Sequence, residues 1–192
     1  MGDMAGRRTD ARQKMVSAAR ELLREQGYHA TALSDVLRRS EAPRGSVYFH
    51  FPGGKAELAV EAAALHSQEQ VSAIDSAAAA ATSPAELVRA YLERARTNLV
   101  ASDYRQGCTI APLVIESTRD SDELDAVGRR SFETIIAALA GHFVAFGLAP
   151  DDARRLADVT VAGAEGALIT ARALRDPAPF DAMIDVLTRG IA

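Results

Sequence analysis

The sequence predicts an all-α protein, in which an N-terminal three-helix helix-turn-helix domain is followed by a larger C-terminal helical domain. Apolar residues recur at helical spacing along most of the chain, and alanine, the strongest helix former, supplies many of them. Proline, glycine and capping residues mark helix starts and ends, with no convincing strand and no internal repeat between them. These patterns together favour helices packed on helices.

The composition is that of an ordinary globular protein. The chain has 192 residues, of which 48% are hydrophobic and 25% charged, so it can bury a sizeable core. It contains no apolar run long enough to span a membrane, and its basic, polar N-terminus does not resemble a secretory signal. Its one cysteine, Cys108, excludes an internal disulfide. A cytoplasmic location is expected.

The charge is unevenly divided along the chain. Residues 1–52 hold nine Arg and Lys against six Asp and Glu, whereas residues 53–192 hold thirteen against twenty. Such a division suggests a basic part that faces nucleic acid and an acidic remainder. A chance imbalance of a few charges is the alternative.

The first predicted helix spans about residues 10–26, after a disordered basic arm at 1–8. Thr9 is the candidate N-cap, and Gly27 is the expected stop. The helix has one apolar face, formed by Ala11, Met15, Ala18, Ala19, Leu22 and Leu23.

The second and third predicted helices are short and joined by a tight turn. Thr31 is the candidate cap of the second, which runs to about Arg39 with Leu33, Val36 and Leu37 on one face. Pro43 suits the first turn of the third, which ends near Phe49. Two such helices braced by the first make a helix-turn-helix.

Further helices follow to the end of the chain. Ser83 and Glu86 form a capping box with a proline between them, and Pro112 predicts that the helix around residues 108–117 is short or kinked. The alanines at 77–81 either continue the preceding helix or form a link. The predicted helices are residues 55–74, one from residue 84 through Leu99 that ends before a loop at 103–107, 121–146, 150–175 and a last one through Phe180, Met183, Ile184, Leu187 and Ile191. The inner face of 121–146 holds Phe132, Ile135, Ile136, Leu139, Phe143 and Phe146.

The helix at 150–175 is apolar or small on most sides from Val159 to Leu174. A helix that is apolar around its circumference must be buried on several faces. A subunit interface is one way to bury them in a domain of this size.

The stretch from Ala42 to Lys55, APRGSVYFHFPGGK, carries the most specific chemistry. Gly45 and Ser46 are small enough to let a helix backbone approach base edges in a major groove. Arg44 can donate two parallel hydrogen bonds to a guanine. The stretch is therefore interpreted as the recognition helix of a DNA-binding protein.

The remaining residues of the stretch divide into inner and outer positions. Tyr48 and His50 present polar tips to phosphates at the groove rim, and Lys55 adds a cation at a helix start. Val47 and Phe51 are expected to point inward, and Phe49 could point either way. Each residue alone is more often a packing or surface residue; their occurrence in one segment favours DNA binding.

The residues PRGSVYFHFPGGK resemble the tetracycline-repressor (TetR) family, and in particular a subgroup that includes lincomycin-resistance and flavonoid-responsive repressors. The segments GCTIAPLVIES and AEGALITARALRDPAPF are also similar to that subgroup. Two departures stand out. Ala32 replaces the Thr or Ser of many members, and the doubled glycine lengthens the spacing to Lys55 by one residue. The candidate DNA-binding residues are Thr31, Arg44, Gly45, Ser46, Tyr48, His50 and Lys55.

The resemblance implies a DNA-binding domain at residues 1–54 and a ligand-binding and dimerisation domain at 55–192. It further implies a repressor that binds a palindromic operator as a homodimer, joined through the last two helices and released by a small apolar or aromatic molecule. No metal or cofactor is expected. A small helical enzyme or a helical adaptor without DNA is the alternative, although no catalytic motif is present. The candidate effector-binding residues are Tyr91, Cys108, Leu113, Phe143 and Phe146; a filled core is the competing interpretation for each.

Overall fold

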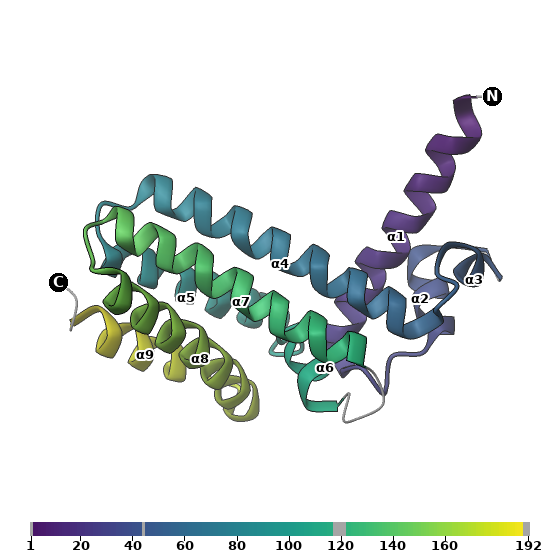
Figure 1. Ribbon diagram of the computed structural model, residues 1–192. Coiled ribbons are helices and arrows are strands. Elements are labelled where there is room, and N and C mark those ends of the chain that lie inside the picture. Colours follow the sequence, from purple (N-terminus) through teal and green to yellow (C-terminus); the bar gives the residue numbers. More distant parts are fainter. Residues whose placement is uncertain (1, 44, 117–121, 190–192) are drawn as a thin grey trace. The chain divides into compact units, whose positions relative to one another are not determined.

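The computed structural model describes residues 2–43, 45–116 and 122–189, and in these ranges the chain forms helices and no strand (Figure 1). The all-α prediction is therefore confirmed. The helices are α1 (Gly2–Gln26), α2 (Leu33–Ser40), α3 (Ser46–His50), α4 (Gly54–Ala80), α5 (Pro84–Ala101), α6 (Ala111–Glu116), α7 (Asp122–Ala145), α8 (Pro150–Leu174) and α9 (Ala178–Arg189).

The helices pack into two compact units. The first unit holds α1, α2, α3, α6, the part of α4 up to His66 and the part of α7 up to Ser131. The second holds α5, α8, α9 and the remaining parts of α4 and α7. The division into functional domains at residues 54 and 55 stays a prediction.

The core of the first unit is built from apolar side chains on several helices. The predicted inner faces of the first two helices are confirmed, since Met15 and Leu23 of α1 and Val36 of α2 are buried. The other members of this core are Val16, Ala18, Ala19, Leu22, Val47, Phe51, Leu58, Ala59, Ala62, Ala63, Leu113, Leu124 and Val127. Segments distant in sequence thus share one apolar core.

The beginning of α1 differs from the prediction. The helix starts at Gly2, so Thr9 lies inside it and is not its N-cap, and the expected disordered arm is helical from residue 2 onward. Met, Ala and Arg favour helix, and in this segment Gly6 is the main residue that opposes it. The predicted stop at Gly27 is correct, because this glycine adopts a left-handed φ of 83°.

The later helix boundaries mostly follow the predicted signals. The alanines continue α4 to Ala80, and α6 is the short helix expected around Pro112. Ser83 caps α5 by accepting the backbone N–H of Glu86 at 3.3 Å. The Glu86 carboxylate accepts the N–H of Thr82 at 2.6 Å, one residue before the position expected for a capping box.

Helix α8 buries one face within the second unit, against α5 and α9. Its buried face is made mainly of small residues, namely Ala153, Ala157, Thr160, Val161, Ala164, Ala167 and Ala171. On the opposite side Val159 and Ile169 are 50% and 61% exposed. Within one chain, α8 is therefore buried on one face and not on several. The predicted inner face of α7 is confirmed at Ile135, Leu139 and Phe143.

Candidate nucleic-acid interface

Helix α2 begins without the predicted side-chain cap. Its N-cap residue is Ala32, which has no capping side chain, and Thr31 lies one residue earlier. The Thr31 hydroxyl is buried and donates to the carbonyl oxygen of Gly27 at 2.6 Å. Thr31 thus ties the end of α1 to the start of α2, and the predicted cap is wrong because that hydroxyl already has a buried partner.

The turn between α2 and α3 is closed by main-chain geometry. Glu41 ends α2 in the left-handed conformation, with φ of 55°, and the N–H of Ala42 donates to Leu37 at 3.1 Å. Gly45 then adopts a φ of 90°, which favours glycine, just before α3. Pro43 consequently lies in the turn, and its predicted place in the first turn of α3 is wrong.

Ser46 closes the turn from the other side. Its N–H and its hydroxyl both donate to the carbonyl oxygen of Pro43, at 3.1 and 2.7 Å. Gly45 beside it is exposed, and a Cβ added there would meet no atom within 4 Å. Arg44, the predicted guanine reader, lies outside the described residues.

Helix α3 has an inner and an outer side. Val47 and Phe51 are 2% and 0% exposed, so their predicted inward orientation is confirmed. Tyr48 and Phe49 are 65% and 61% exposed, which places Phe49 on the outer side. His50 is half-buried, and its ring meets that of Phe49 edge-on at a centroid distance of 5.0 Å.

Lys55 is held within the first unit. Its ammonium donates to the carbonyl oxygen of His29 at 3.1 Å and lies 4.4 Å from the centre of the Tyr28 ring. Burial lowers the pKa of Lys55, although the Glu116 carboxylate opposes that change. Gly54, with φ of 67°, lets the doubled glycine turn into α4 just before this lysine. In this structure Lys55 therefore joins the start of α4 to the α1–α2 turn.

Glu116, at the end of α6, contacts the same turn. Its carboxylate accepts the N–H of His29 at 2.7 Å, and its carbonyl oxygen lies 2.9 Å from the His29 ring nitrogen Nε2. A Cβ at Gly27 would come within 2.3 Å of this carboxylate and would displace it, and the φ of 83° independently favours glycine here. Sequence reasoning missed this contact, because it joins residues 87 positions apart and no local pattern signals it.

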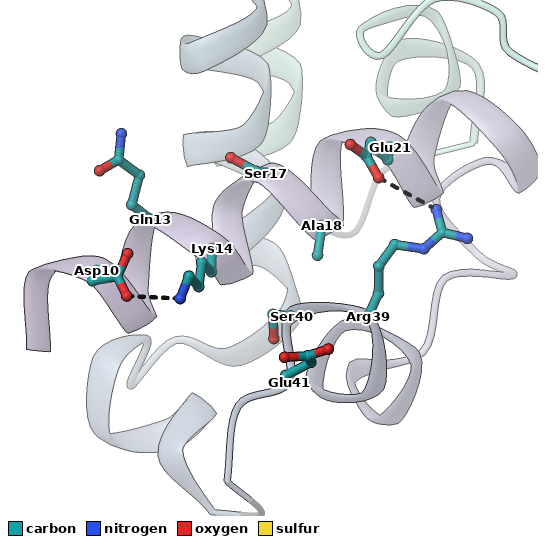
Figure 2. Close-up of a pocket in the computed structure, with 9 residues that line it drawn as sticks. All are labelled: Asp10, Gln13, Lys14, Ser17, Ala18, Glu21, Arg39, Ser40 and Glu41. Carbon is teal, nitrogen blue, oxygen red and sulfur yellow. Dashed lines mark ion pairs between the residues drawn. The ribbon is translucent and has the colours of Figure 1, made fainter. Parts of the chain in front are cut away.

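Four cations in the described parts of α1 and α2 pair with acids of the same unit, namely Arg12, Lys14, Arg38 and Arg39. A polar groove of about 450 Å³ lies between α1 and the end of α2 (Figure 2). Within it Lys14 pairs with Asp10 at 2.8 Å, and this hydrogen bond raises the pKa of Lys14. Arg39 lies 3.9 Å from Glu21 and pairs with Glu25 at 2.8 Å. These pairs neutralise one another, so the exposed aromatic side of α3 is the more distinctive surface.

The predicted effector-binding residues are distributed over both units. Leu113 and Cys108 belong to the first, where Leu113 is fully buried in the apolar core. Tyr91, Phe143 and Phe146 belong to the second, where Phe143 is fully buried and the other two are half-buried. Their part in effector binding stays a prediction.

Two kinds of feature are absent from the described part of the chain. It contains no group of three or more His, Cys, Asp or Glu side chains placed to hold a metal ion. None of its helices combines the length and apolar character needed to cross a membrane.

Family models match both parts of the chain. Residues 15–62 match the N-terminal model of the bacterial regulatory proteins of the tetR family. Residues 84–186 match the model of the C-terminal domain of LmrA/YxaF-like transcriptional regulators. The first match covers the helix-turn-helix, and the second covers more than half of the chain.

Individual relatives agree with these matches. An uncharacterized HTH-type transcriptional regulator of Mycobacterium tuberculosis is 39% identical over 88% of each chain. The HTH-type transcriptional regulator LmrA of Bacillus subtilis is 28% identical over 89% of this chain and 91% of its own length. The solved structure of the regulatory protein TetR from Rhodobacter sphaeroides has a TM-score of 0.84 at 25% identity, covering 95% of this chain and 99% of its own. The chain thus belongs to the TetR family of helix-turn-helix transcriptional regulators, a family of DNA-binding proteins and not of enzymes, and its C-terminal domain is of the LmrA/YxaF-like kind.

Proposed function

We propose that this regulator is a repressor that binds a palindromic operator as a homodimer, with α3 of each protomer in a major groove. The observation that carries the proposal is the two-sided character of α3. Val47 and Phe51 fasten it to the core, while Tyr48 and Phe49 are mostly exposed. A recognition helix needs one side anchored and one side free to meet base edges.

Within this interface the residues have different roles. Gly45 and Ser46 lie at the start of α3, where small residues permit close approach of backbone to DNA. Tyr48 and His50 are proposed to contact phosphates, and Arg44 to read a guanine. Thr31 and Lys55 already have partners at the α1–α2 turn, and they support the interface by fixing that turn.

Dimerisation is proposed to occur through α8 and α9. Val159, Ala162, Gly166 and Ile169 are exposed and spaced three and four residues apart, which places them on one stripe of α8. Val186 of α9 is 66% exposed as well. An apolar stripe of this kind on a protein's surface is typical of an interaction site, and a second copy would bury it.

The effector is proposed to be a small apolar or aromatic molecule that lowers operator affinity. Paired half-sites lie about one helical turn apart (~34 Å), so a change in the separation of the two α3 helices loses the simultaneous fit. The effector then acts by binding the poorly fitting state more tightly. Phe143, Phe146 and Tyr91 supply the aromatic groups proposed to receive it. Such a regulator works where chromosomal DNA lies, in the cytoplasm.

Operator binding is tested with the full-length chain and a random duplex library. Selection is expected to enrich a palindrome, and fluorescence anisotropy then measures its affinity against unselected DNA across salt concentrations. Arg44→Ala should cost about 1–3 kcal/mol on the selected site with the fold unchanged. Enrichment of no sequence would contradict the proposal, and an equal loss on unselected DNA would contradict base reading by Arg44.

The dimer is tested by analytical ultracentrifugation of matched variants. Ile169→Asp places a charge on the proposed stripe and should yield monomers. Val100→Asp is the control, since Val100 is also exposed, at 42%, but lies on α5. Dimers that survive Ile169→Asp, or that are equally lost in the control, would exclude this stripe as the interface.

A further inference from the structure

The outer side of α3 exposes two aromatic rings, and hydrogen bonds to the DNA backbone would use only one of them. Tyr48 and Phe49 are adjacent, and each is more than 60% exposed although the helix has only five residues. Tyr48 ends in a hydroxyl that can contact a phosphate. Phe49 has no hydrogen-bonding atom, so its exposed ring is suited to an apolar partner.

The orientation of Phe49 is fixed by its neighbours on the helix. Val47 and Phe51, two positions to either side, are buried and anchor α3 to the core. The Phe49 ring packs edge-on against His50, at 5.0 Å between centroids and an interplanar angle of 83°. The ring is thus held on the side of α3 that faces away from the core.

The hydrogen-bonding side chain at the start of α3 is already engaged. The Ser46 hydroxyl donates to the carbonyl oxygen of Pro43 at 2.7 Å, so its proton is directed back into the turn. An oxygen lone pair of Ser46 remains available, but its donor is used. Among the described residues of α3, Phe49 is the exposed side chain that is wholly apolar, which suits it to an apolar feature of DNA.

The major groove presents one such feature, the C5-methyl group of thymine. A phenyl ring placed against this methyl removes apolar surface of both groups from water. We infer that Phe49 is a specificity-determining residue that selects thymine by contact with this methyl group, once in each half-site. The inference rests on the proposed operator binding and adds a base preference to it.

The experiment removes the methyl group and nothing else. Full-length protein selects its operator from a random duplex library, and each thymine of the selected site is then replaced by deoxyuridine in both half-sites. At one symmetric pair of positions this change should weaken wild-type binding roughly three- to fivefold per methyl, or tenfold or more for the pair. Phe49→Ala should bind the thymine and uracil duplexes equally, and Phe49→Leu should keep part of the difference.

Tyr48→Ala is the matched control, because Tyr48 is the neighbouring exposed ring on the same helix. It should weaken binding to both duplexes and leave their ratio at the wild-type value. Circular dichroism and thermal unfolding check that each variant is folded, which the exposure of both positions favours.

The outcomes separate the inference from the proposed function. Specific binding that is insensitive to every uracil substitution, or a methyl dependence that persists in Phe49→Ala, overturns the inference while leaving the repressor proposal intact. The first of these results would assign Phe49 to sequence-neutral packing against deoxyribose. Failure to select any operator overturns the proposed function and the inference with it.

Discussion

The region around α3 and the helix α8 are held in place in contrasting ways. Helix α3 has five residues and depends on two large buried side chains, Val47 and Phe51, together with turns fastened by side chains distant in sequence. Helix α8 has 25 residues and depends on a repeated face of small ones. Stability is therefore concentrated in a few contacts near the recognition helix and spread over many along α8. Single truncations should be most damaging in the first region, and single enlargements in the second.

The largest expected effect comes from truncating the two phenylalanines of the recognition stretch separately, which tests whether α3 depends on its buried side chains. Phe51→Ala removes a fully buried ring and should destabilise the protein by about 3–5 kcal/mol. Phe49→Ala, two residues earlier and 61% exposed, should change stability by less than about 0.5 kcal/mol. Urea unfolding measures both. Similar losses at the two positions would show that α3 lacks the inner and outer sides described above.

A second comparison tests whether the contact of Glu116 with the α1–α2 turn stabilises the protein. Gly27 and Gly147 both follow helix ends with positive φ, so alanine should cost about 1–2 kcal/mol at either. At Gly27 the new methyl also displaces the Glu116 carboxylate from the N–H of His29, which should add about 1–2 kcal/mol. At Gly147 a Cβ meets no atom within 4 Å.

Thermal and urea unfolding measure how much more stability Gly27→Ala loses than Gly147→Ala. Glu116→Gln, which keeps an acceptor but removes its charge, should fall between the wild type and Gly27→Ala. Equal losses for Gly27→Ala and Gly147→Ala would mean that the Glu116 contact contributes nothing to stability.

These two comparisons also separate what could be predicted from sequence from what could not. The inner positions Val47 and Phe51 were predictable because i, i+4 spacing and flanking breakers are local signals. The α5 cap and the Gly27 stop were predictable for the same reason.

The errors include the start of α1 at Gly2 and the place of Pro43 in the turn before α3, and others involve polar contacts. Thr31 was predicted to cap α2, but its hydroxyl bonds back to Gly27. Lys55 was predicted to contact phosphate, which stays a prediction, and its contacts with His29 and Tyr28 had no sequence signal. The Glu116 contact had no sequence signal at all. Hydrophobic periodicity predicts which residues share a helix face, but it does not predict which polar groups form hydrogen bonds with one another.

Enlarging a small buried residue tests whether α8 depends on close packing of its small-residue face. Ala164 is 4% exposed on the packed face of α8, and Ala164→Leu should destabilise by about 1–3 kcal/mol because the added atoms find no space. Ala173→Leu is the control on an exposed position of the same helix, and it should have little effect on unfolding. A stable Ala164→Leu variant would indicate that α8 is not closely packed against its neighbours.

The smallest expected effect concerns the local contact that starts α5. The N–H and hydroxyl of Thr82 donate to the Glu86 carboxylate at 2.6 and 2.9 Å, and these bonds hold the pKa of Glu86 below its ordinary value. Because the folded state has the lower pKa, this stabilisation is complete above the ordinary carboxyl range and is lost as the pH falls through the folded value.

Glu86→Gln keeps an oxygen acceptor but cannot ionise, so it should lower Tm slightly at pH 7 and leave Tm unchanged near pH 2. The carboxylate is fully exposed, so the difference at pH 7 should be small and should shrink in high salt. Thermal unfolding of both proteins across this pH range checks the sign. A Tm gap that widens on acidification would show that the charge of Glu86 opposes folding. Compared with the loss expected for Phe51→Ala, this weak and screened effect marks the lower end of the range, because it concerns one exposed contact at a helix start.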